Sequence, residues 1–350
     1  MADRLFIVTG AFGHLGNTLV RKLLEQGEHV RGLALPGEQV VPFGSPEPEI
    51  IRGDVRDKKS LAPLFASPEG TDVYVIHTAG IVTISSKFVQ KVYDVNVTGT
   101  KNILEMCRLY HVKRLVHVSS VHAIPEQGYG KVMTEIDHFS AEDVHGLYAK
   151  TKAEATQAVL DAAREGLDAC VVHPSGIIGP GDYGHGHLTQ MIMDYMDGRL
   201  TACVKGGYDF VDVRDVADGI LAAARKGQKG GCYILSNRYM AVPELLSVLH
   251  DVTGKRAIRT VLPFWFARCT APLSEIYYKI RRQPPLYTAY SMDVLHGNGS
   301  FSHDKATREL GYCPRPLEET LRDTAEWLYQ NHRLKKTLPT MEKKASRATG

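Results

Sequence analysis

The chain has 350 residues, of which 43% are hydrophobic and 23% are charged. This composition excludes a largely disordered or collagen-like chain, and the length favours two domains or one large α/β domain with an added cap. The net charge is +3, but residues 331–350 carry six basic side chains against one acid, a net +5 that leaves −2 for residues 1–330. The basic character therefore belongs to a tail, which we expect to be poorly ordered, and it does not indicate a nucleic-acid partner.

Short apolar runs alternate with helical patterns along the chain. In chain order we expect strands at 5–8, 30–35, 49–52, 73–78, 114–118, 169–173, 210–212 and 232–235. We expect helices at 14–26, 94–110, 147–165, 188–198, 215–226 and 317–330. Because the strand segments are almost continuously apolar, they should be buried on both faces of a parallel sheet. The predicted fold class is therefore α/β, with a doubly wound Rossmann sheet.

The regular alternation stops at a segment rich in proline and glycine, 178–187, and resumes near residue 210. We therefore expect residues 1–180 and 210–238 to form the α/β core. Residues 181–209 and 239–330 should form a smaller cap.

Targeting signals and cysteine spacing favour a cytoplasmic protein. No signal-peptide pattern is seen near Met1, and no apolar run reaches the ~20 residues that a membrane span needs. The six cysteines are spread along the chain without metal-binding spacing, which indicates reduced thiols and gives no reason to expect a metal site.

A glycine-rich turn follows the first strand. Gly10, Gly13 and Gly16 have the spacing Gly-x-x-Gly-x-x-Gly. The first two would let backbone N–H groups approach a pyrophosphate, and the third would let the helix pack closely on the strand. The N-terminus of that helix adds free N–H donors. The turn therefore predicts a dinucleotide site, also lined by Phe12, His14 and Leu15.

Five segments in order resemble the extended short-chain dehydrogenase/reductase family, from about residue 4 to about residue 330. They are the glycine turn and the motifs Gly-Asp-Val-Arg-Asp at 53–57, His-Thr-Ala-Gly at 77–80, Asp-Val-Asn-Val-Thr-Gly-Thr at 94–100 and Tyr-x-x-x-Lys at 148–152. The resemblance implies that Asp54 and Val55 hold the adenine and that Thr78, Ala79 and Gly80 line the cofactor. It also implies that Asn96 belongs to a proton relay.

Tyr148 and Lys152 lie four residues apart and therefore share one face of a helix. A phenol with a pKa near ~10 is a weak acid at neutral pH, and a nearby ammonium favours its phenolate. Tyr148 could then exchange a proton with a carbonyl oxygen. The resemblance gives Lys152 a second role on the nicotinamide ribose. It also places the carbonyl-binding hydroxyl at Ser120, with Ser119 as the alternative.

The cofactor is predicted to be NAD or NADP, and the sequence leaves the choice open. An acid at the end of the second strand would favour NAD and an arginine would favour NADP. Ala34 and Leu35 stand there instead, and Arg31 comes too early in the strand.

The segment after the sixth strand is similar to the loop that covers the nicotinamide in the family, which implies cofactor contacts for His173, Pro174, Ser175 and Ile177. Its His-Pro-Ser form resembles dihydroflavonol reductases and 3β-hydroxysteroid dehydrogenases. Val121 and His122 stand where dehydratases carry an acidic pair, which argues against dehydration.

We therefore expect an NAD(P)-dependent oxidoreductase that interconverts a carbonyl and an alcohol on an apolar substrate, such as a ketosteroid, flavanone or aldehyde. A sugar-nucleotide epimerase is the first alternative, and a non-catalytic dinucleotide-sensing protein is the second. The resemblance also implies that a homodimer could form through the helices at 94–110 and 147–165. Aromatic side chains of the cap could line the substrate pocket or fill its core; they are Tyr183, Tyr195, Tyr208, Phe264, Trp265, Tyr277, Tyr278 and Tyr287.

Overall fold

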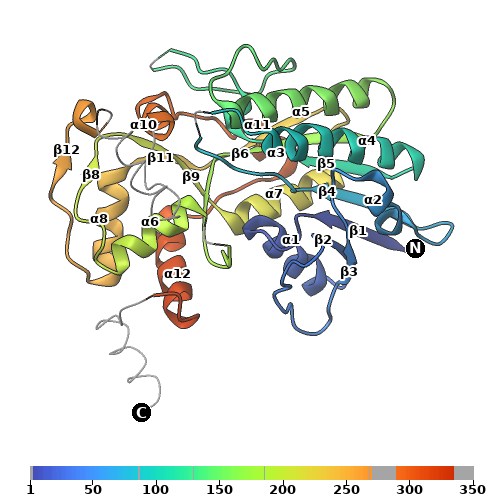
Figure 1. Cartoon of the computed structure of the whole chain (residues 1–350), viewed down its shortest axis with the longest axis horizontal. Coiled ribbons are helices and arrows are strands. Elements are labelled where there is room, and N and C mark those ends of the chain that lie inside the picture. The colour runs from blue at the N-terminus through green and yellow to red at the C-terminus, as the bar shows by residue number, and fades with distance from the viewer. Residues whose placement is uncertain are drawn as a thin grey trace.

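The structure is a computed structural model, and it describes residues 3–85, 87–128, 130–184, 186–267, 269 and 289–334. Figure 1 shows a core around one large sheet beside a smaller unit built mainly from later parts of the chain. The tail beyond residue 334 lies outside the described residues, and so do Tyr277, Tyr278 and Tyr287.

The large sheet has seven strands in the order β10-β6-β5-β4-β1-β2-β3, and every pair is parallel. The strands are β1 (Arg4–Thr9), β2 (His29–Ala34), β3 (Glu49–Arg52), β4 (Asp72–His77), β5 (Arg114–Val118), β6 (Ala169–Pro174) and β10 (Cys232–Leu235). The predicted Rossmann fold is confirmed. The strand order reverses between β1 and β4, the place where ligands bind in such sheets.

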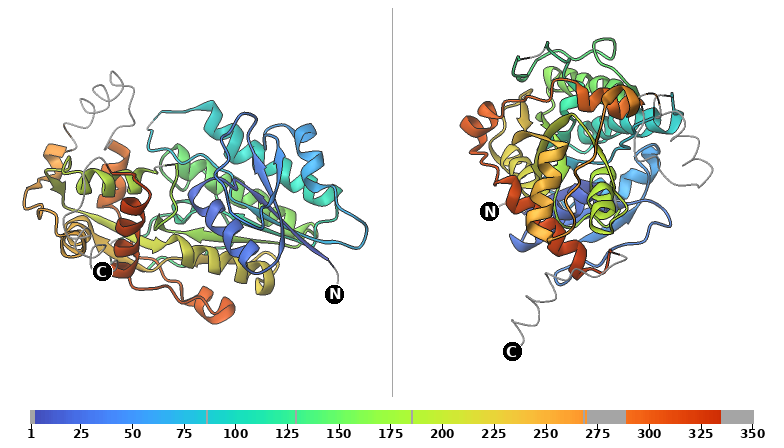
Figure 2. Two further views of the ribbon diagram at one scale, coloured as in Figure 1. Left: turned by 90° about the horizontal axis from the view of Figure 1, so that it is seen from below. Right: turned by 90° about the vertical axis from the view of Figure 1, so that its left-hand side faces the viewer.

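Helices cover both faces of this sheet (Figure 2). One face packs against α2 (Lys58–Phe65), α4 (Gly99–Leu109) and α5 (Leu147–Arg164). The other packs against α1 (His14–Glu25), α7 (Val213–Lys226) and α11 (Asp304–Leu310). Apolar side chains alternate along each strand between these two cores, because successive residues of a strand point to opposite faces.

The predicted helix at 94–110 is interrupted. A short α3 (Gln90–Tyr93) leads into a π-helical segment, η1 (Asp94–Thr98), before α4 begins. Such segments inside helices often mark functional sites. This one carries Asn96, so the irregularity lies at a predicted relay residue.

The smaller unit has its own core, formed by α6 (His187–Met196), α8 (Val242–Thr253) and α12 (Leu317–Gln330) around a second sheet. That sheet has the order β11-β9-β7, with β7 (Gly176–Ile178), β9 (Gly207–Asp212) and β11 (Arg238–Ala241). The remaining elements are β8 (Cys203–Val204), which pairs with β12 (Val261–Leu262), the single-turn η2 (Val121–Ala123) and α10 (Ala289–His296).

The short strands β7, β8, β11 and β12 have only two to four residues each, too few for a hydrophobic pattern to predict them. Residues 210–212, predicted as part of the core, end β9 of the second sheet. The division of the chain into core and cap therefore stays a prediction.

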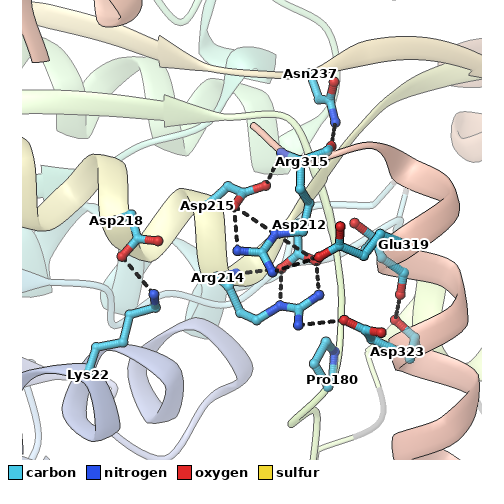
Figure 3. A network of polar contacts seen from close by, with 12 residues as sticks. Lys22, Pro180, Asp212, Arg214, Asp215, Asp218, Asn237, Arg315, Glu319 and Asp323 are labelled. Atoms are coloured by element: carbon cyan, nitrogen blue, oxygen red, sulfur yellow. Dashed lines mark hydrogen bonds and ion pairs between the residues drawn. The ribbon is translucent and has the colours of Figure 1, made fainter. Parts of the chain in front are cut away.

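An ion-pair network joins the N-terminus of α7 to α12 (Figure 3). Arg315 contacts Asp215 at 2.8 Å, and Arg214 bridges Asp212 and Asp323 at 2.7 Å each. Asp212 is fully buried. Burial acts to raise its pKa, but hydrogen bonds from Arg214 outweigh this and leave the pKa of Asp212 below its ordinary value. The network therefore fixes the C-terminal helix against the core.

Candidate active site

The glycine turn lies at the reversal point of the sheet. Gly10 has φ of +68°, a conformation that favours glycine, and a Cβ there would lie 2.8 Å from the Thr78 hydroxyl. A Cβ on Gly16 would lie 2.0 Å from the carbonyl oxygen of Gly10. Gly13 precedes α1 and provides no side-chain cap, so the first N–H groups of that helix keep their capacity to bind an anion. These features fit a bound pyrophosphate.

The other residues of the turn face the protein interior. Phe12 and Leu15 are buried in the core, and the Phe12 ring lies 5.7 Å from the Phe43 ring. Nε2 of His14 lies 3.0 Å from the Pro180 carbonyl, and burial lowers the pKa of this histidine. His14 thus holds the glycine turn against the segment that follows β7.

At the predicted adenine end, the Asp54 carboxylate accepts hydrogen bonds from Arg56, as short as 2.6 Å. These bonds lower the pKa of Asp54. Val55 is buried beneath α4, where a Cβ on Gly99 would lie 2.7 Å from its Cγ2. An adenine amino group would therefore share the Asp54 carboxylate with Arg56.

Two charged side chains contact the backbone just after β2: Glu38 from the following loop and Arg52 from the end of β3. The backbone N–H of Leu35 donates to the Glu38 carboxylate at 2.8 Å, and Arg52 donates to the carbonyl oxygens of Leu35 and Glu38. Arg31 pairs with Glu49 and with carbonyl groups near the end of α2. The Arg31 side chain is thus engaged by β3 and the end of α2.

A chain of hydrogen bonds connects the glycine turn to the π-helical segment. The Thr9 hydroxyl lies 2.7 Å from Nδ1 of His77, whose Nε2 lies 3.0 Å from the Thr100 hydroxyl. Thr100 donates to the carbonyl oxygen of Asn96 at 2.7 Å. Because Thr100 gives its only hydroxyl proton to Asn96, it must accept from His77 through Nε2, and Nδ1 of the neutral His77 ring then accepts from the Thr9 hydroxyl. The chain fixes the backbone of η1 relative to the cofactor loops.

The side chain of Asn96 is buried and fully engaged. Its oxygen accepts from Ile81 N–H at 2.8 Å, and its nitrogen donates to the Ile81 carbonyl and the Thr151 hydroxyl. A Cβ on Gly80 would lie 3.4 Å from this oxygen and 3.3 Å from Nζ of Lys152. A side chain at position 80 would therefore crowd both polar groups.

Tyr148 and Lys152 project from the first turns of α5. Lys152 is 5% exposed, and its Nζ donates to the Val118 carbonyl at 2.8 Å. Burial lowers the pKa of Lys152 to about 8. Tyr148 is half-buried, with its ring 5.9 Å from the His122 ring in an edge-on arrangement. The lysine is therefore the protected member of the pair, and the tyrosine is the accessible one.

The two candidate serines have different partners. The Ser119 hydroxyl lies 2.6 Å from the Thr156 hydroxyl on α5, inside the core. The Ser120 hydroxyl accepts from the backbone N–H of His122 at 3.2 Å. Of the two serines, only Ser120 therefore bonds to His122, whose ring contacts Tyr148.

The loop after β6 reaches both sheets. His173 is fully buried, stacks on Phe139 at 5.2 Å and lies 3.0 Å from the Ser120 carbonyl through Nδ1. Pro174 ends β6, Ser175 is buried, and Ile177 belongs to β7. Because the His173 ring is enclosed, we expect its backbone to be the part that lies beside a cofactor.

The sequence predicted no role in the site for His122, and it predicted Tyr208 only as one of several aromatics that line the pocket or fill the core of the cap. Nε2 of His122 lies 3.0 Å from the Tyr208 hydroxyl, and their rings stack at 5.4 Å. His122 follows Ser120 in the sequence, which could have marked it. Tyr208 lies on β9 and comes near only through the fold. Among the other cap aromatics, Tyr195 is a core residue, Tyr183 packs on Trp327, and Trp265 is exposed.

Comparison with known proteins settles the family. The model of the NAD dependent epimerase/dehydratase family matches residues 6–236. The chain belongs to this family. It is therefore an NAD-dependent enzyme of the extended short-chain dehydrogenase/reductase type, as the motifs predicted. No helix in the described part of the chain is long and apolar enough to cross a membrane.

Curated relatives span nearly the same length. The chain is 32% identical over 327 residues to sterol demethylase protein B of Methylococcus capsulatus, covering 92% of this chain and 97% of that protein. It is 30% identical over 316 residues to 4-hydroxy-2-methyl-3-oxo-4-farnesyl-3,4-dihydroquinoline-1-oxide ketoreductase of Stigmatella aurantiaca, covering 88% and 91%. The crystal structure of gox2253 superposes with a TM-score of 0.81 at 29% identity, covering 95% of this chain and 99% of that one.

Proposed function

We propose that this enzyme interconverts a carbonyl and an alcohol on an apolar substrate, with Tyr148 as the acid/base. The observation that carries the proposal is the buried Lys152 ammonium one helical turn from the half-exposed Tyr148, at the edge where Gly80 and Asn96 meet. A nicotinamide bound there would supply or take the hydride at the carbonyl carbon.

Each residue has a separate part in the proton transfer. During reduction, the Tyr148 hydroxyl gives its proton to the carbonyl oxygen and is left as a phenolate. The positive charge of Lys152 stabilises that phenolate. Ser120 donates to the same carbonyl oxygen and orients it, while Asn96 keeps the η1 backbone in place for the return of a proton. In the oxidative direction the same steps run in reverse.

An apolar substrate is supported by the surroundings of Tyr148 and by the relatives. Burial lowers the pKa of His122 to about 4, so this ring is neutral near pH 7. Tyr208 continues the aromatic wall toward Phe210 and Phe301, with ring centroids at 6.2 and 6.4 Å. The names of the two relatives point to a sterol and to a farnesylated ring with a keto group.

The free thiols of the cysteine residues also support our prediction of a cytoplasmic enzyme.

Nicotinamide absorbance tests the proposal. The purified protein is mixed with NADH or NADPH and, separately, with ketosteroids, flavanones, aldehydes and UDP-sugars. We expect oxidation of the reduced cofactor with at least one apolar carbonyl compound. Epimerisation of a UDP-sugar by tightly retained NAD, without net cofactor turnover, would instead establish the alternative function.

A further inference from the structure

Three histidines form a row on the sheet beneath Lys152. His77 on β4 is the register partner of His117 on β5, and their rings lie 5.3 Å apart. His173 lies on the next strand, β6. All three project toward α4 and α5, because the residues two positions before them, such as Val75 and Val171, belong to the core on that face. Lys152 approaches the row from α5.

The three histidines differ in how many of their ring nitrogens have a hydrogen-bond partner. Both ring nitrogens of His77 have hydroxyl partners. By contrast, neither ring nitrogen of His117 has a partner within the described part of the protein, and neither does Nε2 of His173. His117 is 1% exposed and His173 is 0% exposed. Leaving such buried groups unpaired is unfavourable, so their presence needs an explanation.

The protonation state of His173 follows from its partner. Its Nδ1 lies 3.0 Å from a carbonyl oxygen, that of Ser120, so Nδ1 carries the proton and donates. Burial lowers the pKa of His173 to about 4, and the ring is therefore neutral near pH 7. Nε2 of His173 is consequently a buried lone pair without a donor. Burial also lowers the pKa of His117 well below its ordinary value, which leaves this ring with one free acceptor and one free donor.

Lys152, by contrast, has more N–H donors than acceptors. An ammonium group has three N–H donors, and among the described residues only the Val118 carbonyl accepts from it. A bound ribose would take a second donor. Burial is the main cause that lowers the pKa of all three histidines, and the charge of Lys152 lowers it further. The Val118 carbonyl that accepts from Lys152 directly follows His117 in β5, and the Ser120 carbonyl beside His173 lies two residues beyond. Tyr148 is the titratable neighbour on the same helix, and no ion pair of the described chain includes Lys152.

We propose that His117 and His173 are positioning residues for Lys152. Each accepts a hydrogen bond from its ammonium through one bridging water, and so keeps a buried positive charge beside Tyr148. This inference deepens the proposed function, since it explains how the lysine stays charged in a site that burial would otherwise neutralise. His77 takes no part in it, because both of its nitrogens are already bonded.

The test compares two substitutions at each position. His117→Phe and His173→Phe keep a planar ring but remove the lone pairs, whereas His117→Asn and His173→Gln keep an acceptor. The ionisation of Lys152 is followed in the cofactor-free protein by NMR of isotope-labelled lysine side chains, with Lys152→Met to assign the signal. Thermal unfolding of every variant is measured in parallel.

For the phenylalanine variants we expect the pKa of Lys152 to fall by about one unit or more, because its charged form loses an acceptor. Their melting temperatures should fall, since a buried ammonium loses an acceptor. The alkaline limb of the pH–rate profile should move down with the lysine, and the asparagine and glutamine variants should resemble the parent protein. A purely structural role would also lower the melting temperature but would leave the titration unchanged.

The inference is overturned if folded phenylalanine variants titrate Lys152 like the parent protein. Because the titration needs neither substrate nor turnover, it gives its answer even if carbonyl reduction proves to be the wrong reaction. Conversely, activity that survives Tyr148→Phe would reject the proposed mechanism and leave the measured coupling between Lys152 and the histidines intact.

Discussion

The hydroxyl groups of Ser119 and Thr156 lie 2.6 Å apart between β5 and α5. This contact uses the Ser119 side chain inside the core and leaves Ser120 as the hydroxyl connected, through His122, to the ring that contacts Tyr148. The two serines are adjacent in the sequence and chemically identical, so only their partners separate a structural role from a catalytic one.

The serine pair therefore provides a matched test. Ser120→Ala should lower kcat by about 10- to 100-fold, because the substrate carbonyl loses a hydrogen-bond donor in the transition state. Ser119→Ala should keep most of the activity and lose about 1 kcal/mol of stability with the buried hydrogen bond. Steady-state kinetics and urea unfolding of both variants check this. The reverse pattern would make Ser119 the active-site hydroxyl.

Tyr148→Phe tests the acid/base assignment. Without the phenol no proton reaches the carbonyl oxygen, and we expect kcat to fall by at least about 100-fold. The Kd for NADH should change little, since the glycine turn and Lys152 are untouched. Turnover is measured by nicotinamide absorbance, and Kd by quenching of protein fluorescence. A variant that binds cofactor and retains near-parental kcat would exclude Tyr148 as the acid.

The glycines of the turn should differ in what they tolerate. A Cβ on Gly13 would meet only the Gly10 carbonyl, at 3.4 Å, whereas one on Gly16 would lie 2.0 Å from it. We therefore expect Gly13→Ala to fold and to weaken cofactor binding by crowding the pyrophosphate. Gly16→Ala should displace α1 from β1 and destabilise the fold itself. Thermal unfolding with and without NADH separates these outcomes, and equal stability of both variants would contradict the packing argument.

Much of this site could be predicted from the sequence because its motifs are local. The glycine turn and the Tyr148–Lys152 pair depend on spacings within one loop or one helix, and such spacings are visible in the sequence itself. The contact that we propose between Lys152 and the histidines His117 and His173 could not be predicted, because it depends on the register of three parallel strands. Tyr208 was predicted only as one of several cap aromatics, and its contact with His122 could not be predicted because it comes from a second sheet.

The choice between NAD and NADP could not be predicted for a different reason. No acid or arginine follows β2 directly, and the structure shows that more distant residues occupy that place. Glu38 accepts from the N–H of Leu35, and Arg52 donates to the carbonyl of the same residue. Glu38 is an acceptor suited to a ribose hydroxyl, and Arg52 is a cation suited to a phosphate. The sequence around β2 therefore favours neither NAD nor NADP.

The network between α7 and α12 should matter more for stability than the surface pairs around it. Arg315→Met removes the partner of the Asp215 carboxylate, which is only 5% exposed, and we expect a loss of about 3 kcal/mol. Lys22→Met is the control, because Lys22 pairs with an exposed Asp218 and should contribute less than about 1 kcal/mol (Figure 3). Urea unfolding of both variants checks this, and equal losses would show that burial of Asp215 is unimportant.

The buried lysine should make the cofactor-free protein less stable than a variant without it. The pKa of Lys152 is about 8 in the folded state against an ordinary value of 10.5, a difference equivalent to ~3 kcal/mol. Below pH 8 the ammonium is charged in both states, and the folded state bears the whole cost. Lys152→Met should therefore be more stable than the parent protein by about 2 kcal/mol at pH 7, after allowing about 1 kcal/mol for the lost hydrogen bond to Val118.

This advantage should shrink as the pH rises from about 8 toward 10.5, because the folded parent protein then releases a proton that its unfolded chain still holds. Chemical unfolding of both proteins at several pH values measures the gap directly. Reductase activity of the parent protein should fall over the same range as the ammonium that stabilises the Tyr148 phenolate is lost. A constant gap between pH 7 and 10 would show that Lys152 ionises in the folded protein as it does in the unfolded chain.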